Sequence, residues 1–372
     1  MKYLEMYSPY DIKIEKAKGI YIYDDHNKKY IDTFSGIGVM ALGHSNEEVN
    51  RAIKEKLKKH SHISNFFMDE NTEKVAGLLA EDDQKVFFTN SGTESVEFAL
   101  KIVKKIIGDS KILYFSNSFH GRTLGALSVN GFENLTESFK PLLPNTIECE
   151  FNNLDDLKKT LSNNQDIKAI FFEIIQGSGG VVPIDEEFIN YIIKYSEEKN
   201  ILLIADEIQS GLYRTGEKFA FQKYDLKPDI ITVAKALGGG IPLGAVIIKN
   251  SVASYLKKGD HGSTFAPNPL ALAASKTLLE NLENMKIEIK EKSFYFIKKL
   301  YELKSDKIKE IRNQGLMIGI ELKEEDENII ENGIENGILL NVLKNKIIRL
   351  LPALNIKFDE IDKIIDKLRC LL

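Results

Sequence analysis

The chain has 372 residues, 43% of them hydrophobic and 28% charged, which is typical of a soluble globular protein with a large core. Its formal net charge of −5 arises from 50 basic and 55 acidic residues, and no basic stretch is dense enough to indicate nucleic-acid binding. The N-terminus lacks the apolar core of a signal peptide, and no run approaches the roughly 18 apolar residues of a membrane span. We therefore expect a cytoplasmic protein that contacts neither nucleic acid nor a membrane.

The first 60 residues predict two strands and then a helix. Residues 20–34 read as two strands around a polar turn, and residues 46–59 as a helix with one apolar face. From about residue 85, short and nearly continuous apolar runs alternate with helical stretches, which is typical of parallel strands buried on both faces of an α/β sheet. These runs are KVFFTN (85–90), KILYFS (111–116), KAIFFEII (168–175), ILLIADE (201–207) and DIITVAK (229–235).

After residue 265 the pattern changes to a long charged helical region, several short apolar runs and a last helix. We predict an N-terminal segment (1–44) that packs with a small domain, a large domain (45–262) and a small C-terminal α+β domain (263–372). The large domain is expected to hold a mostly parallel sheet flanked by helices. Ligands of such sheets bind beyond the carboxyl ends of the strands, so the residues that follow each strand are the candidate site.

The residues after the first two runs suit an anionic, flat ligand. Ser91 and Glu94 stand at capping-box spacing around Gly92, so the turn is either a phosphate site at a helix N-terminus or a simple helix cap. Phe119 and Arg122 flank Gly121, and an aromatic ring beside a guanidinium suits a flat ring and a carboxylate. An ordinary loop is the alternative there.

Each of the three later runs contains a charged residue within it or near its end. Glu173 lies inside an apolar run, where a carboxylate is costly unless it is paired. Asp206 and Lys235 end two runs 29 residues apart, so they are expected to meet at one edge of the sheet. A salt bridge between them is the simplest interpretation. A metal is the other alternative for Asp206, but no cluster of further ligands accompanies it, and we expect no metal.

Pyridoxal 5′-phosphate requires the same set of groups. It needs a lysine for a Schiff base, an acid beside its pyridine nitrogen, a phosphate cradle and an aromatic plate. Burial of Lys235 would lower the pKa of its amine and make it more nucleophilic. The three glycines at 238–240 would leave room for the cofactor or the substrate.

In order along the chain, these motifs resemble those of the class III, fold-type I pyridoxal-phosphate-dependent aminotransferases, and most of all the acetylornithine aminotransferases. The matching stretches run nearly end to end and are ALGH (41–44), NSGTES (90–95), FHGRT (119–123), IQGSGGVVP (175–183), DEIQSGLYRTG (206–216), PDIITVAKALGGGIPLGA (228–245), HGSTF (261–265), NPLA (268–271), GLMIGIEL (315–322) and RLLPAL (349–354).

The resemblance implies a role for each candidate residue. Lys235 would hold the cofactor and move the proton, and Asp206 would pair with the pyridine nitrogen. The other implied cofactor contacts are Ser91, Gly92, Thr93, Phe119, His120 and Gln209, with Thr264 reaching the phosphate from the partner subunit of a homodimer. The implied substrate contacts are Arg349 for the α-carboxylate of glutamate, Arg122 for the far carboxylate of an acylated ornithine, and Ser64, Asn65 and Glu173.

Two departures from the family pattern concern the substrate. Ser178 stands where the family usually has a glutamate that pairs with the glutamate-binding arginine, so Arg349 would stay available in both half-reactions. Ala266-Pro267 stand where two glycines usually follow HGSTF. The resemblance implies a ping-pong transamination between N-acetylornithine and 2-oxoglutarate, in arginine biosynthesis.

The alternatives within the family are aminotransferases of ornithine, 4-aminobutyrate, N-succinyldiaminopimelate or a lysine-pathway intermediate. An amino-acid epimerase of the same fold is a further alternative. A cofactor-binding regulator without turnover is the alternative from another class, although such proteins usually carry a nucleic-acid-binding module, and none is expected here.

Overall fold

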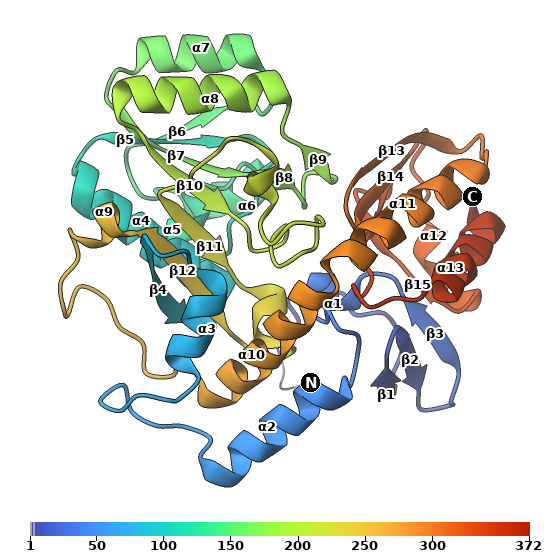
Figure 1. Cartoon of the computed structure of the whole chain (residues 1–372). Coiled ribbons are helices and arrows are strands. Elements are labelled where there is room, and N and C mark those ends of the chain that lie inside the picture. The colour runs from blue at the N-terminus through green and yellow to red at the C-terminus, as the bar shows by residue number, and fades with distance from the viewer. Residues whose placement is uncertain (1, 3) are drawn as a thin grey trace.

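The computed structural model describes residue 2 and residues 4–372. A seven-stranded sheet forms the centre of the larger part, with the strand order β4-β12-β11-β10-β7-β5-β6 (Figure 1). Its strands are β4 (Gln84–Thr89), β5 (Lys111–Phe115), β6 (Thr146–Cys149), β7 (Ile167–Glu173), β10 (Leu202–Asp206), β11 (Ile230–Val233) and β12 (Gly244–Lys249). Each of the five apolar runs named above contributes one of these strands, as predicted.

Both faces of this sheet are buried, which explains why its strands are apolar without alternation. On β7, Phe171 packs toward α4 (Gly92–Ile107), whereas the next residue, Phe172, packs toward α7 (Leu154–Asn163) and α8 (Glu186–Lys199). Neither phenylalanine is exposed to solvent. Figure 1 shows α7 and α8 together above the sheet.

The sheet is mostly parallel, and its exception lies at one side. β11, β10, β7, β5 and β6 are parallel to one another, whereas β12 runs antiparallel to both β11 and β4. β10 and β11 are adjacent and parallel, so the ends that carry Asp206 and Lys235 lie at the same edge, as predicted. The connection between them contains only the 3₁₀ turn η2 (Ala220–Lys223) and no full α-helix.

Two smaller sheets form the right-hand part of Figure 1. One has the order β1-β2-β3-β15 and joins the N-terminal region to the C-terminal region, because β3 pairs in parallel with β15. The other has the order β13-β14-β17-β16 and is antiparallel. Their strands are β1 (Ile14–Lys18), β2 (Tyr21–Asp24), β3 (Lys29–Asp32), β13 (Ile308–Gln314), β14 (Met317–Leu322), β15 (Ile338–Leu339), β16 (Asn341–Leu343) and β17 (Ile347–Leu350).

Long helices connect the two parts. α10 (Pro269–Asn284) packs on α2 (Glu47–Lys59) and α3 (Thr72–Leu79), and α11 (Lys286–Glu302) continues toward α13 (Phe358–Leu371). The proposed domain boundaries near residues 44 and 262 stay predictions. The remaining elements are short: α1 (Ser35–Gly38), α5 (Leu124–Leu127), α6 (Glu133–Thr136), η1 (Glu137–Phe139), β8 (Ile175–Gln176), β9 (Val182–Pro183), η3 (Lys235–Gly238), α9 (Asn250–Ala253) and α12 (Ile329–Glu335).

Candidate active site

A cavity of about 460 Å³ opens at the carboxyl ends of the parallel strands. This is the position at which open α/β sheets bind their ligands. Most segments that line it come from the ends of β4, β5, β7, β10 and β11 and from the loop after η3, with one residue after α1 and one after β8. The lining residues are Val39, Asn90, Ser91, Gly92, Thr93, Phe119, His120, Gly121, Arg122, Glu173, Ser178, Asp206, Ile208, Gln209, Ala234, Lys235, Gly240, Ile241, Pro242 and Leu243.

Asp206 is held at the floor of this cavity by two hydrogen bonds. Its Oδ2 lies 2.6 Å from Nδ1 of His120, and its Oδ1 accepts from the backbone N–H of Ile208 at 3.0 Å. Both the carboxylate and the imidazole are buried. Nε2 of His120 has no partner within the described part of the chain, so the imidazole is directed toward Asp206 alone. This pair fixes the carboxylate in one orientation toward the cavity.

Lys235 follows β11 and adopts a left-handed backbone conformation with φ of 43°. That conformation is uncommon for a residue with a side chain, and strained residues of this kind cluster at functional sites. The side chain lines the cavity and is partly exposed there. Burial, together with the positive charge of Arg349, lowers the pKa of the Lys235 amine to about 8. A Lys235–Asp206 salt bridge, the simplest sequence interpretation, does not form.

Only one of the three glycines after Lys235 faces the cavity. Gly240 lines it, as expected if it leaves room for a ligand. Gly239 has a different role, because a Cβ there would lie 3.2 Å from the side chain of Val49, and its φ is 58°. Gly238 packs against Leu243 in the same way, with a Cβ contact of 3.2 Å. Gly238 and Gly239 therefore allow neighbouring residues to pack closely on the backbone.

The N-terminus of α4 forms one wall of the cavity. Ser91 is the N-cap, and its Oγ accepts from the N–H of Glu94 at 3.3 Å. The carboxylate of Glu94 accepts from the N–H of Asn90 at 2.6 Å, one residue earlier than in a regular capping box. The N–H groups of Gly92 and Thr93 have no intrahelical partner, as at any helix start, and both residues line the cavity. Free N–H groups at a helix start suit an anionic ligand.

Two glycines bring these segments close together. A Cβ on Gly92 would lie 2.9 Å from the Cδ1 of Ile208, which lines the cavity after β10. A Cβ on Gly121 would lie 2.3 Å from the Oγ1 of Thr93. Only glycine therefore allows the loop after β5 to pack on the start of α4. That packing places Phe119 in the cavity wall, with the Arg122 guanidinium 5.8 Å from the centre of its ring.

Glu173 lies at the end of β7, opposite Asp206 in the register of the two parallel strands. It is buried, and its carboxyl accepts only from the N–H of Phe119, at 3.3 Å. Burial and the nearby charge of Asp206 raise its pKa well above the ordinary value for a glutamate. This shift favours the neutral form of Glu173, which lines the cavity.

Arg349 lies one layer behind the cavity wall. It is buried on β17, and its Nη1 donates to the Oε1 of Gln209, which lines the cavity, at 3.2 Å. Its Nε donates to the Oδ1 of Asn341 at 2.9 Å. Asn341 was not predicted from the sequence, because its position opposite Arg349 depends on the register of the short β16–β17 pair.

Besides Arg349, three predicted site residues lie outside the cavity lining. Thr264 is exposed, and Ser64 and Asn65 are exposed on the loop between α2 and α3. The two loops touch, because Nδ2 of Asn65 donates to the backbone carbonyl of Ser263. Ser263 in turn accepts from Nδ2 of Asn90, a cavity residue, at 3.0 Å. A series of hydrogen bonds within one protomer therefore connects these loops to the cavity rim, although the loops lie outside the cavity.

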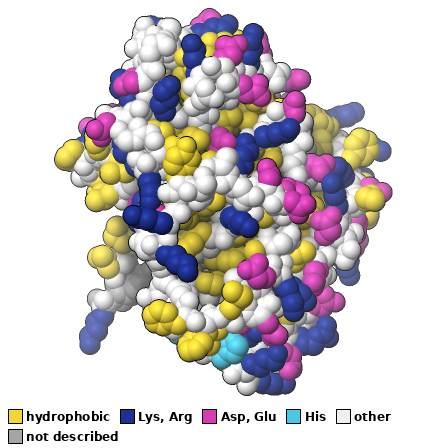
Figure 2. All heavy atoms as spheres, turned by 60° about the vertical axis from the view of Figure 1, so that its left-hand side comes forward, with side chains coloured by type: hydrophobic (Ala, Val, Ile, Leu, Met, Phe, Trp, Pro, Cys, Tyr) yellow, Lys and Arg dark blue, Asp and Glu magenta, His cyan; other side chains and the backbone are white. Residues whose placement is uncertain are grey.

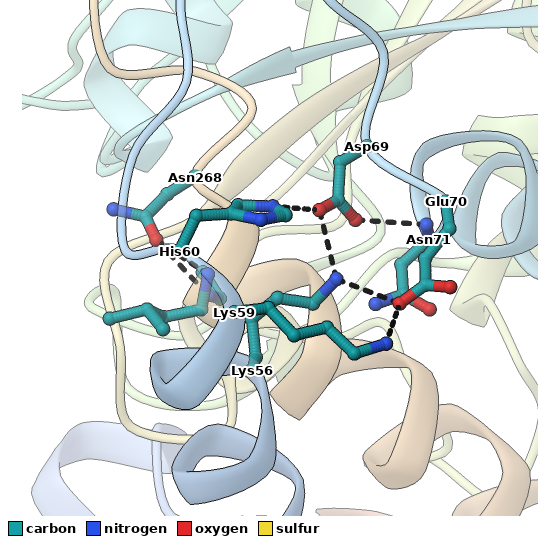
Figure 3. Close-up of polar contacts among 9 residues, drawn as sticks. Lys56, Lys59, His60, Asp69, Glu70, Asn71 and Asn268 are labelled. Carbon is teal, nitrogen blue, oxygen red and sulfur yellow. Dashed lines mark hydrogen bonds and ion pairs between the residues drawn. The ribbon is translucent and has the colours of Figure 1, made fainter.

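An ion cluster centred on the buried Lys56–Asp69 pair closes the base of the loop between α2 and α3 (Figure 3). Lys56, at the end of α2, donates to Asp69 at 2.9 Å and to Glu70 at 3.0 Å. Nε2 of His60 lies 2.8 Å from the same Asp69 carboxylate. We call Lys56, His60, Asp69 and Glu70 the loop clasp. It joins the two ends of the loop that carries Ser64 and Asn65.

The loop tip is apolar and exposed. Phe66, Phe67 and Met68 are exposed, and so is Phe265 on the neighbouring loop. Figure 2, in which the left-hand side of Figure 1 is turned toward the viewer, shows several patches of hydrophobic side chains on this face.

Among the helices of the described residues, none combines the length and the apolar character that a membrane crossing needs.

The residues of the cavity fit pyridoxal 5′-phosphate. The free N–H groups at the start of α4 suit its phosphate, and the ring of Phe119 offers a flat wall. The Asp206–His120 pair supplies a buried carboxylate for the pyridine nitrogen, and Lys235 supplies an amine with a lowered pKa. The described residues contain no group of three or more potential metal ligands close together.

Comparison with known proteins agrees with this geometry. The family described as aminotransferase class-III matches residues 4–372. The acetylornithine aminotransferase of Clostridium acetobutylicum is 41% identical over 97% of this chain and 96% of its own. That of Lactococcus lactis is 44% identical over 96% of each chain. The crystal structure of ornithine aminotransferase from Toxoplasma gondii superposes with a TM-score of 0.93 at 28% identity, over 99% of this chain and 92% of the other. The chain therefore belongs to the class III aminotransferase family, whose members depend on pyridoxal 5′-phosphate.

Proposed function

We propose that the protein transfers an amino group from N-acetylornithine to 2-oxoglutarate, a reaction of arginine biosynthesis. The observation that carries the chemistry is the cavity in which Lys235, the Asp206–His120 pair and the N-terminus of α4 meet. The choice of donor is supported by the two relatives above, which match nearly the whole chain and are both acetylornithine aminotransferases.

When bound, pyridoxal phosphate supplies an aldehyde carbon and a ring that accepts an electron pair. The amine of Lys235 would hold the cofactor and would move the substrate proton. With a pKa of about 8, about half of these amines are neutral and nucleophilic at pH 8. The strained backbone at Lys235 fixes the direction in which the side chain enters the cavity.

Asp206 would keep the pyridine nitrogen protonated. Its hydrogen bonds from His120 and Ile208 hold the carboxylate in place, so no reorganisation is needed during the reaction. Burial and the nearby charge of Asp206 raise the pKa of Glu173, so a second negative charge beside Asp206 is disfavoured.

Two arginines would bind the carboxylates of the substrates. Arg122 is exposed at the cavity wall and is proposed to bind the carboxylate of the acylated donor. Arg349, behind Gln209, is proposed to bind the α-carboxylate of glutamate. Arginine suits both roles because its planar guanidinium donates two parallel hydrogen bonds to a carboxylate.

We further propose a cytoplasmic homodimer with shared active sites. Thr264 is exposed and outside the cavity of its own chain, which fits a contact with the cofactor phosphate of the partner subunit. The exposed apolar tip formed by Phe66, Phe67 and Met68 suits a buried position in such a dimer. Light scattering is expected to give twice the mass of the 42.1 kDa chain, and a monomeric mass would contradict the proposal.

Ornithine is the second candidate donor, because the superposable Toxoplasma gondii structure is an ornithine aminotransferase. A steady-state screen with 2-oxoglutarate as acceptor separates the two. We expect the highest kcat/KM with N-acetylornithine, and a higher value with ornithine would overturn the choice of donor. The same screen should include 4-aminobutyrate, N-succinyldiaminopimelate and a lysine-pathway amine. A racemisation assay tests the epimerase alternative, and absence of turnover with every donor would favour a regulator.

Ser178 offers a test of how the donor is chosen. It lines the cavity beside Gly177, whose carbonyl accepts from Nη1 of Arg349 at 3.0 Å. Ser178→Glu would place a carboxylate that can neutralise Arg349 while the donor reacts. We expect this variant to raise the turnover of N-acetylornithine relative to α-amino donors. An unchanged ratio would show that Ser178 does not control donor preference.

A further inference from the structure

The hydrogen-bond partners of Arg349 within the described residues are uncharged. Asn341 and Arg349 are partners in the antiparallel β16–β17 pair, so their side chains share one face of the sheet. Nε of Arg349 donates to Asn341 at 2.9 Å. Nη1 donates to the carbonyl of Gly177 at 3.0 Å and to the side-chain oxygen of Gln209 at 3.2 Å. All three acceptors are amide oxygens.

Within the described part of the chain, Arg349 forms no ion pair with a carboxylate. Glu173 acts on it only at longer range, and burial disfavours the charged form of Glu173 by raising its pKa. Burial lowers the pKa of Arg349 to about 10, so the guanidinium remains charged at neutral pH. A buried charge without a counter-ion is costly. Such a charge at a cavity is expected to bind an anionic ligand.

Gln209, which accepts from Arg349, lines the cavity, and so does Ser178, the neighbour of Gly177 in the chain. A carboxylate that enters beside Ser178 can displace the Gln209 oxygen from Nη1. This exchange is favourable because a carboxylate binds a guanidinium more strongly than a neutral amide does. It would be unfavourable if a protein carboxylate already held the guanidinium. The exchange also requires that another group keeps Arg349 in place while Gln209 leaves.

We propose that Asn341 is that group: a positioning residue that holds Arg349 by Nε and, being uncharged, leaves its positive charge available to a dicarboxylate substrate. The proposal rests on the proposed function, because it takes Arg349 as the site for glutamate and 2-oxoglutarate. The proposal predicts that a substitution of Asn341 affects the two half-reactions unequally. A change at Asn341 affects the half that uses the dicarboxylate and leaves the donor half nearly unchanged.

Asn341→Asp is the direct test, since it keeps the side-chain shape and places a carboxylate on Nε. In single-turnover experiments on the holoenzyme, we expect the apparent dissociation constant of 2-oxoglutarate to rise at least tenfold, with a rate constant at saturation within about threefold of wild type. The half-reaction with N-acetylornithine should change by less than about twofold. The matched control, Asn332→Asp, adds the same charge on the exposed surface of α12 and should change neither half.

A binding measurement separates this proposal from the choice of donor. Glutarate, a dicarboxylate that cannot react, is titrated into wild-type holoenzyme and each variant by calorimetry, so no amino donor is needed. We expect at least tenfold weaker binding to Asn341→Asp and about threefold weaker binding to Asn341→Ala, which keeps the charge of Arg349 but loses its anchor. Unchanged glutarate binding in both variants would overturn the proposal, as would an equal loss in the two half-reactions of Asn341→Asp. Failure of N-acetylornithine as a donor for wild type would overturn only the donor.

Discussion

Replacing Lys56 by methionine should strongly destabilise the protein, because it removes the cation of the loop clasp. Lys56 is 4% exposed and Asp69 is 5% exposed, so the substitution leaves a carboxylate buried without its lysine. Methionine has nearly the same length as the lysine stem, so packing changes little. Although burial acts in the opposite direction, hydrogen bonds from Asn71, Lys56 and His60 lower the pKa of Asp69, which keeps it ionised.

The size of the stability loss in Lys56→Met follows from the contacts that Asp69 keeps. Removing one partner of a buried ion pair costs roughly 3–5 kcal/mol. Asp69 would keep its contact with His60 at 2.8 Å and its bond from the N–H of Asn71 at 2.9 Å, so we expect the lower end, about 3 kcal/mol. Lys59→Met is the matched control. Lys59 pairs only with Glu70, and both side chains are more than half exposed, so the expected loss is below about 1 kcal/mol.

Urea unfolding of the holoenzyme at pH 7, followed by circular dichroism, measures both losses. The double variant Lys56→Met/Asp69→Asn should be less destabilised than the sum of the two single variants, because it contains no unpaired charge. Figure 3 shows why this coupling is expected, since the two side chains point at each other across the base of the loop. Equal stabilities of Lys56→Met and Lys59→Met would refute the reasoning.

Two further predictions concern pH. Burial raises the pKa of Glu207 to about 7, so its folded-state protonation stabilises the protein at low pH, and this contribution is lost as the pH rises through 7. Glu207→Gln should therefore gain about 2 kcal/mol relative to wild type between pH 5 and pH 8, and a pH-independent difference in urea midpoints would contradict this. The pKa of about 8 for Lys235 predicts that apoenzyme takes up pyridoxal phosphate covalently with a rate that rises about tenfold per pH unit below pH 8 and levels off above it. Stopped-flow absorbance measures that rate, and a flat profile from pH 6 to pH 8 would contradict the role of the neutral amine.

Sequence patterns predicted the main sheet because burial on both faces leaves a clear signal. Phe171 and Phe172 are adjacent, pack on opposite faces and are both fully buried, so the run had to be apolar throughout. The meeting of Asp206 and Lys235 at one edge followed from two consecutive parallel strands. The antiparallel strand β12 between β11 and β4 was not recognised, because a buried apolar strand does not indicate its own direction.

Contacts that depend on register or on loop closure could not be predicted. Asn341 meets Arg349 only because β16 and β17 pair in one register, and a shift by one residue would turn Asn341 to the other face. Lys56 and Asp69 are 13 residues apart across an irregular loop, and no periodicity relates them. The resemblance to a family indicated roles for Thr264, Ser64 and Asn65, and all three stay predictions. The role of Thr264 also requires a partner subunit.

Chemical trapping of the cofactor tests the central claim most directly. Borohydride reduction of the purified holoenzyme, followed by peptide mapping, should place the reduced pyridoxyl group on Lys235 alone. The Lys235→Ala variant should retain no labelled peptide and lose transamination of N-acetylornithine. Labelling of a different lysine, or wild-type turnover by Lys235→Ala, would contradict the assignment of this cavity as the active site.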